Sequence, residues 1–92
     1  MNQTRARILV AEDEPDLAEL VKARLENADY EVAIARDGEE AWQKIQDEEP
    51  DLVLLDLRMP KLNGYRVCRL VRKRFTQRQM PIVIMTVRDR GK

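Results

Sequence analysis

Four short apolar runs, separated by stretches with helical spacing, constrain the fold of this chain more than any other feature of its sequence. The runs are short, mostly rich in β-branched side chains and bounded by polar residues or proline, as buried parallel strands are. They cover residues 8–11, 30–35, 52–55 and 82–85. Between them, apolar residues recur every three or four positions, which is typical of amphipathic helices. The alternation predicts an α/β domain whose parallel sheet carries helices on both faces.

Three helices are predicted between these runs. The first begins near Asp16, which we expect to be its N-cap. Its apolar face is predicted to consist of Leu17, Leu20, Val21, Leu25 and Ala28. The second follows an Asp37-Gly38 turn and covers about 39–47, because Pro50 prevents it from continuing. Gly64 is expected to permit a tight turn into the third, whose inward face is Val67, Cys68, Leu70, Val71 and Phe75.

Length and composition exclude several classes of protein. The 92 residues are enough for one domain, 1–92, and the hydrophobic fraction of 43% is ordinary for a globular chain. No apolar run approaches the roughly 18 residues that span a bilayer, and the N-terminus lacks a signal-peptide core. We therefore expect a cytoplasmic protein with no membrane partner. One cysteine and no histidine exclude an internal disulfide, a zinc site and histidine-based catalysis.

The net charge is zero, but the charge is unevenly placed. Residues 1–64 hold 16 acidic and 8 basic side chains, whereas residues 65–92 hold 1 acidic and 9 basic ones. A basic tract of this kind can bind nucleic acid, yet this one lacks interleaved aromatic side chains on which bases stack. We expect no direct nucleic-acid binding by this chain.

Polar side chains follow three of the predicted strands. Glu12 and Asp13 follow the first, Asp56 the third and Thr86 the fourth. Ligands of open parallel sheets bind beyond the carboxyl ends of the strands, so we expect these residues to converge. Three carboxylates in one crevice repel each other by roughly 3 to 4 kcal/mol per close pair at an effective dielectric near 20. A cation would relieve that repulsion, and oxygen ligands suit Mg²⁺ or Mn²⁺.

Asp56 is the candidate nucleophile in this crevice, because a carboxylate can accept a phosphoryl group as an aspartyl phosphate. The hydroxyl of Thr86 can then hydrogen-bond a transferred oxygen and report the modification. Each of these residues also has a purely structural explanation. Glu12 and Asp13 suit the positive end of a helix, Asp56 suits a solvated loop, and threonine is a good strand former. The functional reading is favoured because a cap needs one acid and Asp56 directly ends the most apolar run.

These residues resemble the receiver domains of two-component response regulators. The resemblance covers the chain from about Arg7 to its end and rests on four segments: 8–15, 51–60, 63–64 and 80–86. It implies a flavodoxin-like receiver fold with strand order 2-1-3-4. It further implies metal-binding acids at Glu12 and Asp13, a phosphoacceptor at Asp56, a metal-binding backbone carbonyl at Arg58 and a switch hydroxyl at Thr86.

The resemblance also implies a regulatory phosphoacceptor rather than an enzyme, able at most to phosphorylate and dephosphorylate itself at Asp56. The phosphoryl donor would be the phosphohistidine of a sensor histidine kinase or of a phosphotransfer protein. The modified state would be relayed to an output domain or partner.

The resemblance has a limit at the end of the sequence. Receiver domains continue through a fourth helix, a fifth strand with a phosphate-binding lysine, and a last helix, whereas this sequence stops at Lys92. We therefore expect an incomplete receiver domain, with the fifth strand and last helix missing. The fourth strand would then have an unpaired edge, which favours a homodimer or segment exchange.

Two alternatives remain at this stage. A truncated, receiver-like scaffold would self-associate through the fourth strand without signalling. A phosphatase of the aspartyl-phosphate type would share the nucleophile, but it normally has an acid two residues later, where this chain has Arg58.

Overall fold

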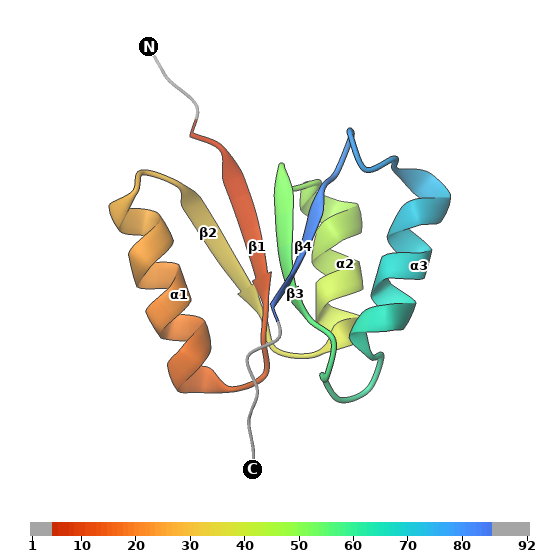
Figure 1. Cartoon of the computed structure of the whole chain (residues 1–92), viewed down its shortest axis with the longest axis horizontal. Helices are drawn as coiled ribbons and strands as arrows, with labels where there is room; N and C mark the ends of the chain where they lie inside the picture. Colours follow the sequence, from red (N-terminus) through yellow and green to blue (C-terminus); the bar gives the residue numbers. More distant parts are fainter. Residues whose placement is uncertain (1–4, 86–92) are drawn as a thin grey trace.

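The computed structural model describes residues 5–85, which form four parallel strands and three helices (Figure 1). Strands and helices alternate along the chain, so the predicted α/β order is confirmed. In sequence order the elements are β1 (Arg7–Ala11), α1 (Pro15–Asn27), β2 (Glu31–Ala35), α2 (Gly38–Glu48), β3 (Leu52–Asp56), α3 (Gly64–Arg74) and β4 (Ile82–Met85).

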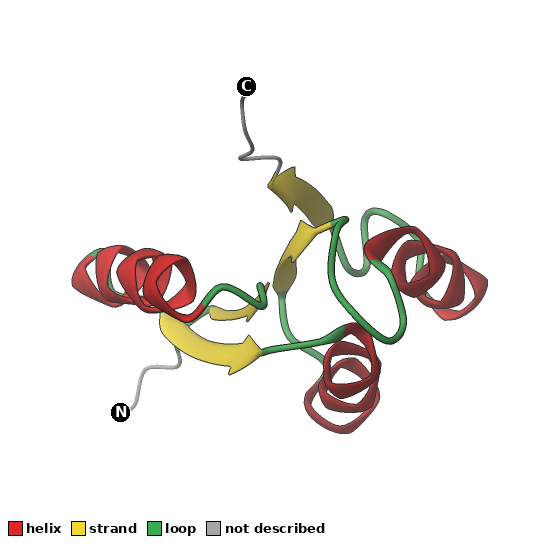
Figure 2. Cartoon of the chain, turned by 90° about the horizontal axis from the view of Figure 1, so that it is seen from below, coloured by secondary structure: helices red, strands yellow, loops and turns green. Residues whose placement is uncertain are grey.

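The sheet has the order β2-β1-β3-β4, which confirms the predicted order 2-1-3-4. All three strand pairs are parallel, so the carboxyl ends of the strands lie at one edge of the sheet. Figure 2 shows α1 on one face of the sheet and α2 with α3 on the other, as predicted. The chain leaves β1 toward β2 on one side and returns to β3 on the other. The crevice between the ends of β1 and β3 is therefore the topological switch point, where α/β sheets bind ligands.

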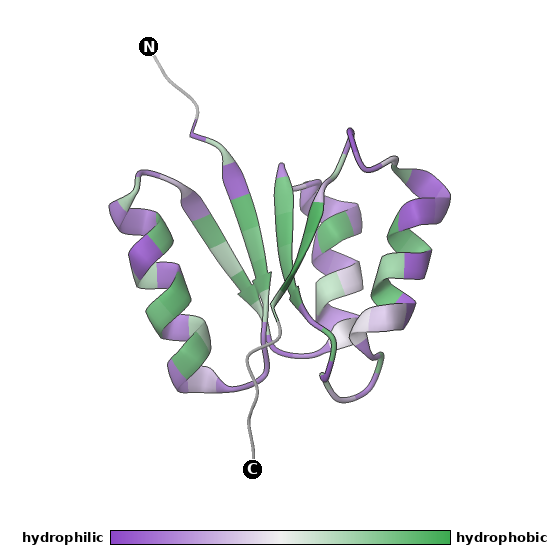
Figure 3. Ribbon diagram, viewed as in Figure 1, coloured by the Kyte–Doolittle hydropathy of each residue, from purple (hydrophilic) through white to green (hydrophobic). Residues whose placement is uncertain are grey.

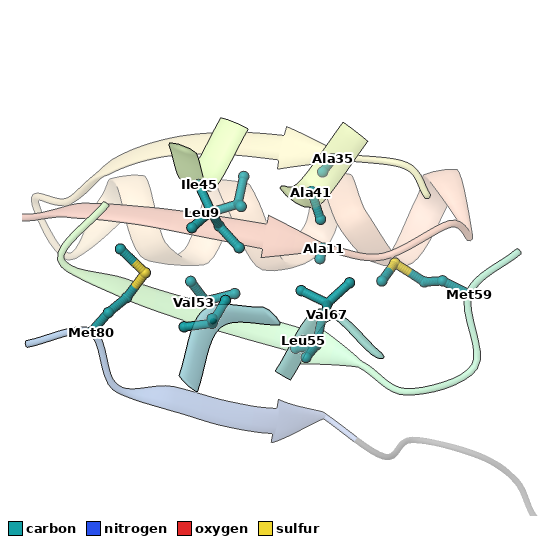
Figure 4. Packing of buried hydrophobic residues seen from close by; sticks show 11 residues of the cluster. Leu9, Ala11, Ala35, Ala41, Ile45, Val53, Leu55, Met59, Val67 and Met80 are labelled. Atoms are coloured by element: carbon teal, nitrogen blue, oxygen red, sulfur yellow. The ribbon is translucent and has the colours of Figure 1, made fainter. Parts of the chain in front are cut away.

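The hydrophobic core lies between the sheet and the pair α2–α3 (Figure 4). Leu9, Val53 and Leu55 point to this face and are at most 1% exposed. Ile45 of α2 and Val67 of α3 are fully buried against them. Burying one such side chain contributes roughly 1.5–3 kcal/mol, so this face fixes β1 and β3 side by side.

The face that carries α1 is less completely covered. Ala18 is the buried residue of α1, whereas Leu20, which was predicted to lie on the apolar face of the helix, is 53% exposed. At 100° per residue the side chain of Leu20 lies about 200° around the helix from that of Ala18. Val83 of β4 is 47% exposed, and Figure 3 shows hydrophobic colouring along the strands. An apolar surface therefore remains on this side of the molecule.

The first helix begins one residue before the predicted cap. Glu14 is the N-cap of α1, and its Oε1 accepts a 2.9 Å hydrogen bond from the N–H of Leu17. Pro15 occupies the first turn, where its missing N–H costs nothing and its fixed φ suits the helix. Asp16 therefore lies inside the first turn, and its prediction as N-cap was wrong. Among residues 5–85, no helix has the length and apolar composition needed to cross a bilayer.

Candidate functional site

Three carboxylates meet at the carboxyl edge of the sheet. Glu12 and Asp13 directly follow β1, and Asp56 is the last residue of β3, the neighbouring strand. One carboxylate oxygen from each residue lies within 4.8 Å of the others. Glu12 and Asp56 are 2% and 4% exposed, whereas Asp13 is open to solvent. The cluster thus consists of two buried carboxylates and one exposed carboxylate.

Glu12 is held in this cluster by its own backbone and by the start of α1. Its N–H donates to the carbonyl of Ala35 at 3.0 Å, and its Oε2 accepts from the N–H of Glu14 at 3.0 Å. Its Oε1 is buried and has no hydrogen-bond partner among the described residues. Burial raises the pKa of Glu12, and the charges of Asp56 and Asp13 raise it further against the lowering effect of the Glu14 N–H.

Asp56 is held by the turn that follows β3. Its Oδ1 accepts a 3.0 Å hydrogen bond from the N–H of Arg58, two residues later. This Asx-type contact orients the carboxylate toward the edge of the sheet without involving a side chain of another element. On the opposite side, Asp56 is in register with Met85, the last residue of β4.

Gly64 brings the start of α3 against the residue that follows Asp56. A Cβ at this position would lie 2.5 Å from the Cα of Leu57 and 2.7 Å from the carbonyl oxygen of Asp56. The N–H of Gly64 also donates to the carbonyl of Leu57 at 3.2 Å. Neither glycine in the described chain has a positive φ, so the turn into α3 does not depend on a conformation that only glycine adopts easily. Close approach of two backbones is what requires glycine here.

The loop between β3 and α3 is also fastened to the start of α2, a feature that was not predicted from the sequence. The N–H of Gly38 donates to the carbonyl of Pro60 at 3.4 Å, and Lys61 lies 3.6 Å from Asp37. A Cβ at Gly38 would overlap the carbonyl of Leu62. The sequence indicates a helix start here, because Gly38 directly follows the capping residue Asp37. Only the fold shows which segment approaches Gly38.

The two other predicted site residues are Arg58 and Thr86. Arg58 lies beside Asp56 through its backbone N–H, and its side chain is exposed. Thr86 lies outside the described residues, directly after β4 in sequence.

The donor chemistry of the cluster fits a small divalent cation. All three side chains offer oxygen, which suits Mg²⁺ or Mn²⁺ and not the softer metals that prefer sulfur or imidazole. The buried, unpartnered Oε1 of Glu12 is an acceptor that a cation or a water bound to one would satisfy. Asp13 is exposed, so a cation that it binds could keep some of the waters that Mg²⁺ usually retains.

Comparison with known proteins shows that the chain is similar to response regulators. Residues 8–92 match the model of the response regulator receiver domain. The alkaline phosphatase synthesis transcriptional regulatory protein PhoP of Bacillus subtilis is 41% identical over 83 residues, which make up 90% of this chain and 34% of that protein. The chain thus spans about a third of the length of this curated relative.

Solved structures agree in fold. The BeF3-activated N-terminal receiver domain of Klebsiella pneumoniae RstA is 36% identical, with a TM-score of 0.82 over 91% of this chain and 69% of that one. The response regulator protein TrrA of Thermotoga maritima, solved in complex with Mg(2+)-BeF, is 40% identical. Its TM-score is 0.82 over 88% of this chain and 69% of that one.

Proposed function

Because the chain belongs to the response regulator receiver domain family, whose members are regulatory signalling domains, we propose that Asp56 accepts a phosphoryl group in a signalling relay. The donor is the phosphohistidine of a sensor histidine kinase or a phosphotransfer protein. The observation that carries this proposal is the convergence of Glu12 and Asp13 on Asp56 within 4.8 Å, at the switch point of the sheet.

Asp56 is the member of the cluster best suited to be the nucleophile. Its Oδ1 is occupied by the Arg58 N–H, which orients the carboxylate and leaves Oδ2 for the incoming phosphorus. Glu12 is less suitable because its Oε2 accepts from the Glu14 N–H and its other oxygen, Oε1, is itself buried. Asp13 is exposed and lacks an orienting contact of that kind among the described hydrogen bonds.

The transfer needs no reactant beyond a proton from water. The phosphorus–nitrogen bond of the donor imidazole breaks, a phosphorus–oxygen bond to Asp56 forms, and the leaving imidazole keeps the electron pair and takes up the proton. Water attack on the acyl phosphate would later restore the carboxylate, which is the self-dephosphorylation that the family resemblance implies. The domain is in this sense a regulatory phosphoacceptor and not an enzyme acting on a separate substrate.

We propose that Mg²⁺, or Mn²⁺ in its place, is held by Glu12, Asp13, Asp56 and the backbone carbonyl of Arg58. When bound, such an ion neutralises negative charge on the phosphoryl oxygens. The fit rests on the oxygen donors and on the unpartnered Glu12 Oε1. The complex of TrrA with Mg(2+)-BeF supports the same chemistry in a relative.

The remaining roles are proposed for the larger protein of which these residues would be the receiver. We propose Thr86 as the hydroxyl that reports phosphorylation and residues 1–92 as an incomplete receiver domain acting in the cytoplasm. The name of PhoP describes a transcriptional regulator, so an output domain that binds DNA is one candidate recipient of the signal.

The chemistry can be tested by intact mass spectrometry. The purified chain would be incubated with acetyl phosphate in Mg²⁺ or in EDTA. We expect a gain of one phosphoryl group in Mg²⁺ alone, lost in Asp56→Asn and retained in Asp51→Asn. Asp51 is a suitable control because it is exposed and lies just before the amino end of β3, and among the described hydrogen bonds its carboxylate accepts only from the Arg7 N–H. A modification that survives in Asp56→Asn would count against the proposal.

A second candidate function rests on the exposed fourth strand. In this reading the domain is a scaffold that does not signal and assembles through β4. β4 is an edge strand of the described sheet, and its Val83 and Ile84 are 47% and 40% exposed. Such edges favour pairing with another chain.

Light scattering separates the two readings. A scaffold would associate equally with and without acetyl phosphate, and Val83→Lys would reduce the association while Tyr65→Lys, an exposed change on α3, would not. If the chain is a monomer at all concentrations, the scaffold hypothesis is wrong.

A further inference from the structure

A groove lies along one side of α3, and none of its residues belongs to the carboxylate cluster. Its volume is about 340 Å³, and it is lined by Leu62, Arg66, Arg69, Leu70 and Lys73. The four positions from α3 are spaced by three, one and three residues, so they form one stripe along two turns of the helix. Figure 3 shows hydrophilic and hydrophobic colouring interleaved along α3.

The positive charge of this groove is not neutralised within the described part of the chain. The helix α3 contains five basic residues and no acidic one. Five ion pairs occur among residues 5–85, and every basic partner in them precedes α3. Arg66, Arg69 and Lys73 therefore have no carboxylate within 4.0 Å in this part of the structure. Their charges are available to a ligand without breaking a contact of the fold.

The groove also has an apolar component. Leu62 and Leu70 are half-buried and line the same hollow as the three basic side chains. A ligand that used only charge, such as a nucleic-acid backbone, would leave these leucines without a partner. The lining contains no aromatic side chain on which a base could stack. The combination of two leucines with three cations matches an amphipathic helix that carries both apolar and acidic side chains.

We propose that this groove docks an acidic amphipathic helix of a partner protein. Apolar side chains of the partner helix would pack against the two leucines, and its carboxylates would pair with the three cations. The charge pairs lie at the rim, where they mainly increase the association rate and make binding sensitive to salt. This interaction uses side chains other than those of the carboxylate cluster Glu12, Asp13 and Asp56.

The test uses fluorescence anisotropy with a designed probe. The probe is a fluorescein-labelled helical peptide of about 18 residues, with leucines on one face and glutamates beside them. A second peptide of the same composition has the leucines scattered around the helix. We expect the first peptide to bind at least about tenfold more tightly than the second, because only it can place leucines and carboxylates together.

Two matched variants locate the binding site. Arg69→Glu with Lys73→Glu reverses two groove charges, and Arg24→Glu with Arg78→Glu reverses two exposed charges elsewhere. We expect the groove variant to lose about tenfold or more in affinity and the control variant to change by less than about threefold at physiological salt. Circular dichroism would verify that both variants are folded.

Three outcomes would overturn the proposal. The first is equal loss of affinity in the two variants, which would show diffuse attraction between net charges. The second is equal binding of the two peptides, which would show that the leucines take no part. The third is tighter binding of a labelled DNA duplex than of the peptide, together with loss of that DNA binding in the groove variant. This result would assign the surface to nucleic acid.

Discussion

Glu12 has surroundings that are unusual for a carboxylate. Its side chain is 2% exposed, faces two other carboxylates and has one oxygen without a hydrogen-bond partner among the described residues. Such a group destabilises a metal-free protein, because a buried charge costs free energy unless it is paired. Unpaired buried groups with a shifted pKa are often found at functional sites, where a ligand can supply the missing partner.

Replacing Glu12 with glutamine should therefore stabilise the chain in the absence of metal. We expect Glu12→Gln to raise the free energy of unfolding in EDTA by about 1 kcal/mol, because the amide is neutral and can donate to Asp56. We also expect Mg²⁺ to raise the melting temperature of the wild type but not that of Glu12→Gln. Thermal melts followed by circular dichroism measure both effects. Glu19→Gln, an exposed change on α1, is the control. A loss of stability in EDTA would contradict this view of Glu12.

Gly64 controls the distance between α3 and the backbone at Asp56. Because a Cβ there would meet Leu57 and the Asp56 carbonyl, we expect Gly64→Ala to cost about 1–3 kcal/mol in unfolding free energy. It should also weaken Mg²⁺ binding, since the turn after Asp56 must shift. Tyr65→Ala, one residue later and 64% exposed, should change stability by less than about 0.5 kcal/mol. Equal effects of the two changes in chemical denaturation would refute the close-approach argument.

Asp37 shows how a single cap fixes the helix α2. Its Oδ1 accepts from the N–H of Glu40 at 2.8 Å, and Lys61 of the loop after β3 lies beside it. The Glu40 N–H, with a smaller effect of the Lys61 charge, lowers the pKa of Asp37 below its usual value of 3.8. The charged cap thus joins the start of α2 to the loop that carries Arg58.

The pH dependence of this cap has a definite sign. A carboxyl group whose pKa is lower in the folded state stabilises the fold above the unfolded pKa and loses that effect as the pH falls through the folded value. We expect Asp37→Asn, which keeps a neutral cap, to be less stable than the wild type at pH about 6 and to approach it at pH about 2–3. Urea unfolding at the two pH values measures this. Asp37→Ala should cost about 1 kcal/mol at pH about 6. If the difference in unfolding free energy between Asp37→Asn and the wild type were the same at both pH values, the charge effect would be contradicted.

The elements of this fold could be predicted from the sequence because their signals are local. The run Leu52–Leu55 is apolar and ends in an acid, and parallel pairing then brings Asp56 beside the acids after β1. The cap of α1 was missed because Pro15 allows the helix to start before Asp16. The close approaches at Gly38 and Gly64 were not predicted, because only the folded loop after β3 brings Leu62 to Gly38 and Asp56 and Leu57 to Gly64. No local pattern reveals such an approach.

At the scale of the molecule, stability is expected to reside mainly on the side of the sheet that α2 and α3 cover. Leu54 and Leu55 are neighbours on β3 that point to opposite faces, and Leu55 is fully buried whereas Leu54 is only partly so. We expect Leu55→Ala to cost about 2–5 kcal/mol and Leu54→Ala clearly less. Urea unfolding of the two variants gives a matched comparison. A larger loss at Leu54 would mean that another chain covers the α1 side in solution.

The signalling role proposed for this chain depends on Asp56 being the residue that carries the phosphoryl group. The most direct measurement is to phosphorylate the chain with acetyl phosphate in Mg²⁺, reduce the acyl phosphate with borohydride and locate the reduced residue by peptide mass spectrometry. Reduction converts the modified aspartate to homoserine, which marks its position permanently. We predict homoserine at Asp56 alone, and none when EDTA replaces Mg²⁺. Reduction at Asp13 or Glu12, or at several acids regardless of Mg²⁺, would contradict the assignment of this cluster as a phosphoacceptor site.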